Sequence, residues 1–81
     1  MRIPRNESGK NLITKLSQYG YHVTRQSGSH IRLTRENKEK TNHITIPNHD
    51  PIRIGTLQSI LKEVAHQLEI SKEALIIKLY K

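Results

Sequence analysis

The sequence predicts a single α+β domain in which helices pack on one face of a three-stranded antiparallel sheet. Two observations lead to this prediction. Apolar residues recur at helical spacing near both ends of the chain, whereas residues 21–47 contain three segments in which apolar and polar residues alternate. The expected element order is α-β-β-β-α-α. At 81 residues the chain has room for one domain, residues 1–81, with one modest core.

The first helix is predicted to begin after Ser8. The hydroxyl of this residue can accept a hydrogen bond from the N–H groups of the first turn, which have no partner within the helix. Gly20 supplies the C-terminal stop. Between these two residues, four apolar side chains recur at helical spacing: Leu12, Ile13, Leu16 and Tyr19.

The first two strands are predicted to form a hairpin, because residues 21–26 and 30–34 alternate and are joined by the short link Ser27-Gly28-Ser29. Gly28 is free to take a positive φ in this turn. The polar run 35–42 is expected to be an exposed loop. A third strand, residues 43–47, follows and should end at Pro47.

Successive side chains of a strand alternate between the two faces of a sheet, which sorts the strand residues into two sets. The set expected to face the helices is Tyr21, Val23, Ile31, Leu33, Ile44 and Ile46. If Gln26 pairs with His30, then Thr24 lies opposite Arg32 and His22 opposite Thr34. These six residues, with His43 and Thr45, would form an uncovered polar face.

Two further helices follow the turn-forming segment 48–53. The longer one has a narrow apolar stripe made of Leu57, Ile60, Leu61, Val64 and Leu68. Ser71 can cap a last helix that runs from Lys72 to about Tyr80, with Leu75, Ile76 and Leu79 on its apolar side.

The charge distribution favours a polyanionic partner. The chain has 14 Lys and Arg residues against seven Asp and Glu, a formal charge of +7. Residues 1–35 hold seven basic residues and only one acidic residue, Glu7, so that half carries +6 and the rest +1. A basic face of this kind attracts phosphate groups through counterion release, although basic residues also serve solubility alone.

Several classes of function are excluded. There is no cysteine, hence no disulfide and no thiolate chemistry, and no apolar run long enough for a signal peptide or a membrane span. We therefore expect a cytoplasmic protein without a membrane role. Five histidines raise the question of a metal, but there is no HExxH motif, and Asp50 is the only acid beside His49. We expect neither a metal nor a small-molecule cofactor.

His30 is the strongest candidate for chemistry, because it directly follows a tight turn, is expected on the open face and precedes Arg32 by two residues. Cleavage of RNA without a metal needs one group that takes the proton of the ribose 2′-OH and one that protonates the leaving oxygen. Imidazole can do either near neutral pH. Arg32 could neutralise charge on the phosphate, and the amides of Gly28 and Ser29 could donate to its oxygens.

The other histidines are weaker candidates. His49, in the loop before the long helix, is the best candidate for a second proton-transfer group, with a solvated or turn-capping role as the alternative. His22 and His43 could bind phosphate when protonated, or could be ordinary polar strand residues. His66 lies opposite the apolar stripe of its helix and is expected to be solvated, without a function.

An ordered set of short motifs carries a family resemblance. The motifs are Arg5-x-x-Ser8-Gly9-Lys10, Gly20-Tyr21, Arg25-Gln26-Ser27-Gly28-Ser29-His30, Ile46-Pro47-x-His49 and Gly55-Thr56-Leu57-x-Ser59-Ile60-Leu61-Lys62. Over about residues 4–68 the chain resembles the HicA (YcfA-like) toxin family. The helix over about residues 72–80 lies outside this resemblance.

The resemblance implies a fold like that of a double-stranded RNA-binding domain, endoribonuclease action on mRNA, and neutralisation by an antitoxin of the HicB type. It also implies that His30 is the essential histidine, with Gly28 and Ser29 completing its motif. The candidate RNA-binding residues are Gly28, Ser29, Arg32, Arg25 and Lys10. One departure is Ile31, where many members have a second histidine or a small apolar residue.

Two other functions stay open at this point. The α-β-β-β-α order alone is also typical of a non-catalytic RNA-binding module, although the segment 52–55 lacks the lysine cluster that duplex RNA binders usually carry there. A small protein-interaction subunit, whose basic surface meets an acidic protein, is the third possibility.

Overall fold

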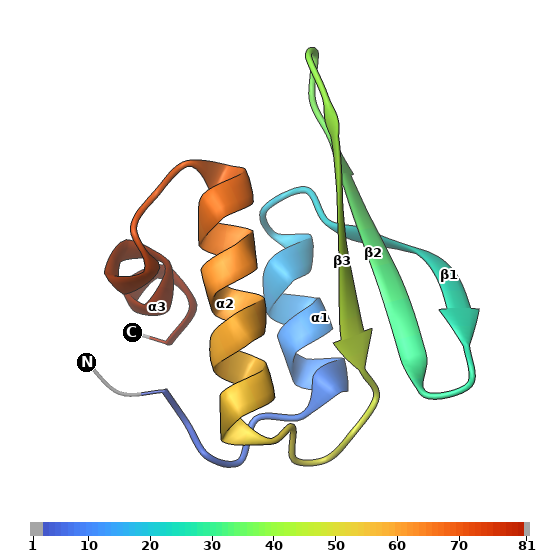
Figure 1. Cartoon of the computed structure of the whole chain (residues 1–81), viewed down its shortest axis with the longest axis vertical. Helices are drawn as coiled ribbons and strands as arrows, with labels where there is room; N and C mark the ends of the chain where they lie inside the picture. The colour runs from blue at the N-terminus through green and yellow to red at the C-terminus, as the bar shows by residue number, and fades with distance from the viewer. Residues whose placement is uncertain (1–2, 81) are drawn as a thin grey trace.

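The computed structural model describes residues 3–80, and the predicted domain limits 1 and 81 lie outside this range. The elements are α1 (Gly9–Ser17), β1 (His22–Ser27), β2 (His30–Glu36), β3 (Thr41–Pro47), α2 (Ile54–Leu68) and α3 (Lys72–Tyr80). α1 and α2 lie on one face of the sheet, and α3 packs against α2 (Figure 1). The predicted α+β fold is confirmed, with α3 as an addition to the α-β-β-β-α core.

The helices begin where the sequence predicts. The Ser8 hydroxyl accepts from the backbone N–H of Asn11 at 3.0 Å, and the Ser71 hydroxyl accepts from that of Ala74 at 3.0 Å. α1 ends at Ser17, and Gly20 then takes a φ of 93°, a backbone conformation that suits glycine.

In the described part of the chain, no helix is long and apolar enough to cross a membrane.

The core lies between the sheet and the helices. Its fully buried members include Leu12 and Leu16 of α1, Leu33 and Ile46 of the sheet, and Leu57, Leu61 and Val64 of α2. The apolar stripe predicted for α2 therefore faces the core, with Leu68 only partly buried. Gln67 of α2 makes polar contacts across the core: the Tyr21 hydroxyl donates to its side-chain oxygen at 2.6 Å, and its side-chain nitrogen donates to the His43 carbonyl at 2.7 Å.

A β-bulge changes the predicted register of the first hairpin. The three strands form a sheet in the order β1-β2-β3, and His22 lies opposite Thr34 as expected. Beyond Val23 the register shifts by one residue, so that Arg25, rather than Thr24, lies opposite Arg32. The predicted Gln26–His30 pair is likewise wrong: Gln26 lies opposite Ile31, and Ser27 lies opposite His30. Gln26 thus leaves the open face and Arg25 joins it, because directly opposed residues project to the same side.

The second hairpin is longer than predicted. β2 runs to Glu36 and β3 begins at Thr41, so the loop is only residues 37–40 instead of 35–42. The side-chain oxygen of Asn37 accepts from the backbone N–H groups of Glu39 and Lys40, both at 2.9 Å. This local bonding closes a tight turn, which leaves the flanking polar residues free to continue the ladder.

β1 is the outer strand and differs from the rest of the sheet. All six of its residues are exposed, and Val23, predicted to face the core, is 50% exposed. In Figure 1, β1 lies at the side of the sheet away from α2 and α3, whereas α2 packs against β3. The alternation of Val23 with its neighbours predicts its face correctly, but not whether a helix covers that face.

Candidate active site

His30 is the first residue of β2 and follows a two-residue turn, Gly28-Ser29. Gly28 has a φ of 59°, and a Cβ added there would meet nothing within 4 Å. Glycine is favoured at this position by the left-handed backbone of a tight hairpin, not by crowding. The imidazole of His30 is exposed and projects from the end of the sheet, on the polar face.

The loop that carries His49 is held in place by three backbone hydrogen bonds. Asn48 N–H donates to the Ser29 carbonyl at 2.7 Å, which ties the loop to the turn before His30. Gly9 N–H donates to the His49 carbonyl at 2.9 Å, and Ile52 N–H donates to the Glu7 carbonyl at 2.7 Å. The irregular segment between β3 and α2 is therefore bonded on one side to the hairpin and on the other to the start of α1.

Glu7 anchors this junction from inside the protein. Its side chain is 2% exposed and accepts from Asn11 Nδ2 at 2.8 Å and from the Tyr80 hydroxyl at 2.7 Å. Lys15 Nζ lies 4.0 Å from the same carboxylate and 5.5 Å from the centre of the Tyr80 ring. Burial and the hydrogen bond to Glu7 raise the pKa of Tyr80 well above its usual value, so this hydroxyl stays a donor. α3 is thus linked to the segment that holds the His49 loop.

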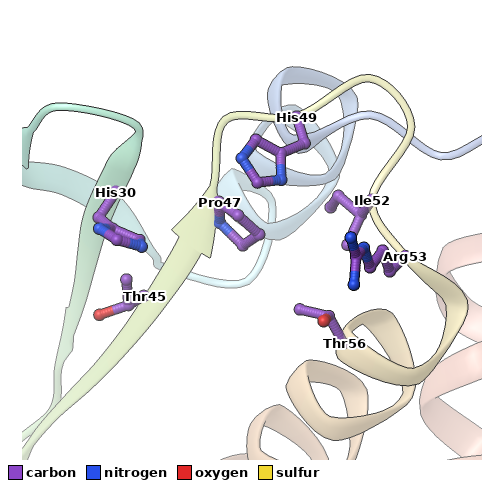
Figure 2. A pocket seen from close by; sticks show the side chains of 7 residues that line it. All are labelled: His30, Thr45, Pro47, His49, Ile52, Arg53 and Thr56. Carbon is purple, nitrogen blue, oxygen red and sulfur yellow. The ribbon is translucent and has the colours of Figure 1, made fainter.

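A groove of about 450 Å³ opens at this end of the sheet. Figure 2 shows side chains from four elements around it: His30 from β2, Thr45 and Pro47 from β3, His49 and Ile52 from the connecting loop, and Arg53 and Thr56 from the start of α2. Pro47 lies between the two histidines. The lining contains two imidazoles, one guanidinium and two hydroxyls, but no acidic side chain.

The start of α2 adds donors to the groove. Arg53 is the N-cap residue of this helix, and no side chain caps it. The N–H groups of the first turn have no partner within the helix and carry the positive end of the helix dipole. The edge formed by Arg53 and Thr56 therefore suits an anion, and phosphate is the common biological one.

The predicted site residues fall into two groups. His30 and His49 line the same groove, as the prediction of a second proton-transfer group requires. Arg32 does not line it. Arg32 lies two residues further along β2, half-buried, opposite Thr45 on one side and Arg25 on the other. Lys10 is exposed in the first turn of α1 and is also outside the groove lining.

The remaining histidines lie elsewhere. His43 Nδ1 is 3.0 Å from the Thr34 hydroxyl, which is itself 2.7 Å from the Thr24 hydroxyl, so these three form a polar chain on the open face. His22 is exposed on β1 and His66 is exposed on α2. Among residues 3–80, no group of three or more His, Asp or Glu side chains is placed to hold a metal ion.

Three polar residues of the groove are not among the site residues that the sequence predicts: Arg53, Thr45 and Thr56. Thr45 is on the expected open face, but its alternation with Ile44 and Ile46 does not distinguish it from other polar strand residues. Arg53 offers one signal, since it is the single cation between β3 and α2 and directly precedes a helix. Whether that cation turns toward His30 depends on the path of the loop, which the sequence does not specify.

These features define a small, basic α+β protein whose groove combines two imidazoles with one guanidinium. Residues 9–65 match the family model described as HicA toxin of bacterial toxin-antitoxin systems. Neither the curated proteins nor the solved structures give a match to the chain.

The chain therefore belongs to the HicA toxin family and is a toxin of a toxin-antitoxin system, with a cognate antitoxin as its partner. The matched range contains His30, His49, Arg53 and Thr56, and it ends before α3.

Proposed function

We propose that this toxin is an endoribonuclease that cleaves mRNA by proton transfer between its own side chains, with His30 as a catalytic residue and His49 as the second proton-transfer group. The observation that carries the proposal is that His30 and His49, 19 positions apart in sequence, line one groove together with Arg53. One imidazole can serve only one of the two proton transfers in a single step. Two imidazoles on one groove supply both.

The proposed reaction is a transesterification within the RNA strand. The neutral imidazole takes the proton of the ribose 2′-OH while the 2′ oxygen attacks the adjacent phosphorus. The protonated imidazole gives its proton to the 5′ oxygen as the bond from phosphorus to that oxygen breaks. The products are a 2′,3′-cyclic phosphate and a 5′-hydroxyl, and the two histidines exchange protonation states.

Arg53 takes the role of phosphate binder that the sequence had suggested for Arg32. Its guanidinium lines the groove, whereas that of Arg32 does not. A guanidinium can donate two parallel hydrogen bonds to non-bridging phosphate oxygens and offset the charge that grows on them in the transition state. The first-turn N–H groups of α2 and the hydroxyl of Thr56 lie on the same side of the groove and support this role.

Gly28, Ser29 and Lys10 are proposed to contact RNA at the border of the groove. The turn Gly28-Ser29 directly precedes His30 and is exposed, which supports contacts between its backbone and the RNA strand. Lys10 directly follows Gly9, whose Cα packs against the backbone of Pro47 and Asn48. A cation at the start of α1 therefore lies beside the loop that carries His49.

The test is cleavage of a defined RNA by the purified protein in the presence of EDTA. We expect cleavage to persist with EDTA, to give cyclic phosphate ends, and to fall by roughly 10² to 10⁴ in His30→Ala. His66→Ala is the matched control, because His66 is exposed on α2 and outside the groove. Circular dichroism and thermal unfolding check that both variants fold. Full activity in folded His30→Ala, after removal of contaminating nuclease, would contradict the assignment.

The same assay separates the enzyme from an RNA-binding module, because a protein that only binds RNA would leave the length of the RNA unchanged.

For the partner, we propose an antitoxin of the HicB type. Expression of the toxin should stop growth, His30→Ala should relieve the arrest, and co-expression of the adjacent antitoxin gene should restore growth of cells with the unaltered toxin. Growth arrest that persists with His30→Ala would point to a toxic activity other than cleavage.

A further inference from the structure

The β-bulge in β1 brings two arginines together on the open face of the sheet. Arg25 lies directly opposite Arg32, and the shift of register between Val23 and Arg25 produces this pairing. Without the bulge, Thr24 would lie opposite Arg32 and Arg25 would project to the other face. Bulges occur preferentially beside active sites, where they redirect a side chain.

This arrangement is unfavourable for folding alone. Like charges directly opposite each other on neighbouring strands destabilise a sheet. Within the part of the chain that the structure describes, neither guanidinium takes part in a hydrogen bond or ion pair; Arg35, by contrast, donates to the Tyr19 carbonyl at 3.0 Å. The described residues therefore leave two neighbouring guanidinium groups without an anion.

The arginine pair continues the groove. Arg32 lies opposite Thr45, which lines the groove, and projects to the same face as His30. At about 3.3 Å of strand rise per residue, Arg32 lies roughly 6.6 Å along β2 from His30. This separation is comparable to the distance between neighbouring phosphates in an extended single strand.

The surface around the pair is suited to an RNA backbone. On the open face, the described strand residues include one acid, Glu36, which lies opposite Thr41 at the far end of β2. Beyond the pair are the hydroxyl of Thr24 and the imidazole of His43, both on exposed residues and joined through the buried hydroxyl of Thr34 by contacts of 2.7 and 3.0 Å. None of the three tyrosines belongs to this face, so the surface offers charge and hydroxyl groups rather than platforms for base stacking.

We propose that Arg25 and Arg32 form a second phosphate-binding subsite, which holds a backbone phosphate next to the scissile one and directs a single RNA strand from the groove across the open face of the sheet. This inference rests on the proposed ribonuclease function. Because its contacts are to phosphate, the subsite contributes affinity and position but no preference for a base sequence.

The experiment measures RNA affinity as a function of salt in the His30→Ala background, so that the RNA stays intact. Fluorescence anisotropy with a labelled single-stranded RNA gives the slope of log Kobs against log[KCl]. Arg25→Gln and Arg32→Gln should each reduce the slope, and the double variant should lose about 0.7, the value for one phosphate contact on a single strand. Lys62→Gln is the charge-matched control, because Lys62 is exposed on α2; its slope should remain that of the His30→Ala parent.

A substrate with one methylphosphonate next to the scissile position gives an independent readout. The neutral linkage should weaken binding to the His30→Ala parent, and this loss should disappear when both arginines are already glutamine. Thermal unfolding should show that the Arg25→Gln/Arg32→Gln protein is as stable as its parent or more stable, since a like-charge pair is removed.

Two outcomes would overturn the subsite: salt slopes of the arginine variants equal to that of Lys62→Gln, or equal effects of the methylphosphonate in both proteins. A failure of the proposed function would look different. In that case the protein with His30 present would leave the RNA uncut. The salt dependence of RNA affinity in the arginine variants would still show whether Arg25 and Arg32 bind phosphate.

Discussion

The two sides of the groove are built in different ways. His30 lies on a hairpin whose backbone is bonded by a ladder with one β-bulge and whose outer strand, β1, is exposed at every residue. His49 and Arg53 lie on an irregular loop that is fixed by backbone hydrogen bonds to Glu7, Gly9 and Ser29. Tyr80 of α3 donates a further hydrogen bond to the side chain of Glu7. The groove therefore depends on buried contacts on its loop side and on local turn geometry on its hairpin side. Changes on the loop side should lower stability and activity together, whereas changes on the hairpin should leave stability nearly unchanged.

The greatest loss of stability is expected at Gly9, on the loop side of the groove. A Cβ at this position would overlap the carbonyl oxygen of Pro47, and backbone atoms cannot move aside easily. We expect Gly9→Ala to lower the free energy of unfolding by about 2 to 3 kcal/mol and to reduce cleavage, because the His49 loop is displaced. Urea unfolding and the RNA cleavage rate measure the two effects.

Gly55→Ala is the matched control for Gly9→Ala. Gly55 lies in the first turn of α2, and a Cβ there would meet nothing within 4 Å. This substitution should leave the protein as stable or stabilise it by up to about 1 kcal/mol, because alanine favours a helix. Equal loss of stability in the two variants would show that Gly9 is not a close contact of the loop.

A smaller effect is expected at Tyr80, which joins α3 to the loop side. Tyr80→Phe keeps the ring but removes the donor to the buried carboxylate of Glu7. We expect a loss of about 1 to 2 kcal/mol of unfolding free energy, since a buried acceptor loses a partner. Tyr19→Phe is the control, because no hydrogen bond of its hydroxyl is present among the described contacts. Equal unfolding midpoints for the two variants would contradict a stabilising link through Glu7.

The alkaline limb of the stability curve tests the burial of Tyr21. Burial raises the pKa of Tyr21 from 10.0 to about 12, with Arg35 lowering it and Glu63 raising it further. In the unfolded chain Tyr21 loses its proton near pH 10, whereas in the folded protein it keeps the proton to about pH 12. The folded state therefore binds more protons in this window, and stability should fall as the pH rises from 10 to 12.

Tyr21→Phe should flatten that decline when urea midpoints are compared at pH 9, 10 and 11. The hydrogen bond from the Tyr21 hydroxyl to Gln67 is lost at every pH, so this variant is compared by slope and not by its absolute stability. An unchanged slope would mean that Tyr21 titrates alike in both states.

The smallest effect is expected on the exposed hairpin strand. Val23→Thr keeps a β-branched side chain on a position that is 50% exposed, and we expect a change within about 0.5 kcal/mol and normal RNA cleavage. Chemical denaturation and the cleavage assay check both statements. A loss of more than about 1 kcal/mol would show that β1 packs against another part of the protein. The hairpin side of the groove would then contribute to stability as the loop side does.

Much of this fold follows from local patterns in the sequence. Ser8 and Ser71 cap helices, the stripe from Leu57 to Val64 faces the core, and Gly28 turns the hairpin before His30, all as predicted. Each of these features depends on residues within a few positions of one another. The exposed His66 and the end of β3 at Pro47 follow in the same way.

What the patterns do not predict depends on distant contacts. No residue in the segment 23–25 marks the bulge, which shows only when β1 is paired with β2. The exposure of Val23 depends on how far the helices extend over the sheet, and the place of Arg53 depends on the three bonds that fix the loop. For this reason His30 could be chosen from the sequence, whereas its neighbours in the groove had to come from the structure.

The central claim is that His30 and His49 act as the two proton-transfer groups of one reaction. An RNA with sulfur in place of the 5′ bridging oxygen at the cleaved position tests it directly. A thiolate leaves without protonation, because a thiol is far more acidic than an alcohol. The group that acts as the acid is then no longer needed, whereas the group that acts as the base still is.

The measurement is the single-turnover cleavage rate of His30→Ala and His49→Ala on the normal and the sulfur-containing RNA. Both variants should cut the normal RNA slower than the unaltered protein by roughly 10² to 10⁴. On the sulfur-containing RNA, one variant should recover a rate close to that of the unaltered protein, and the other should stay slow. A His49→Ala protein that cuts normal RNA at the full rate, or sulfur that restores neither variant, would contradict the two-histidine account.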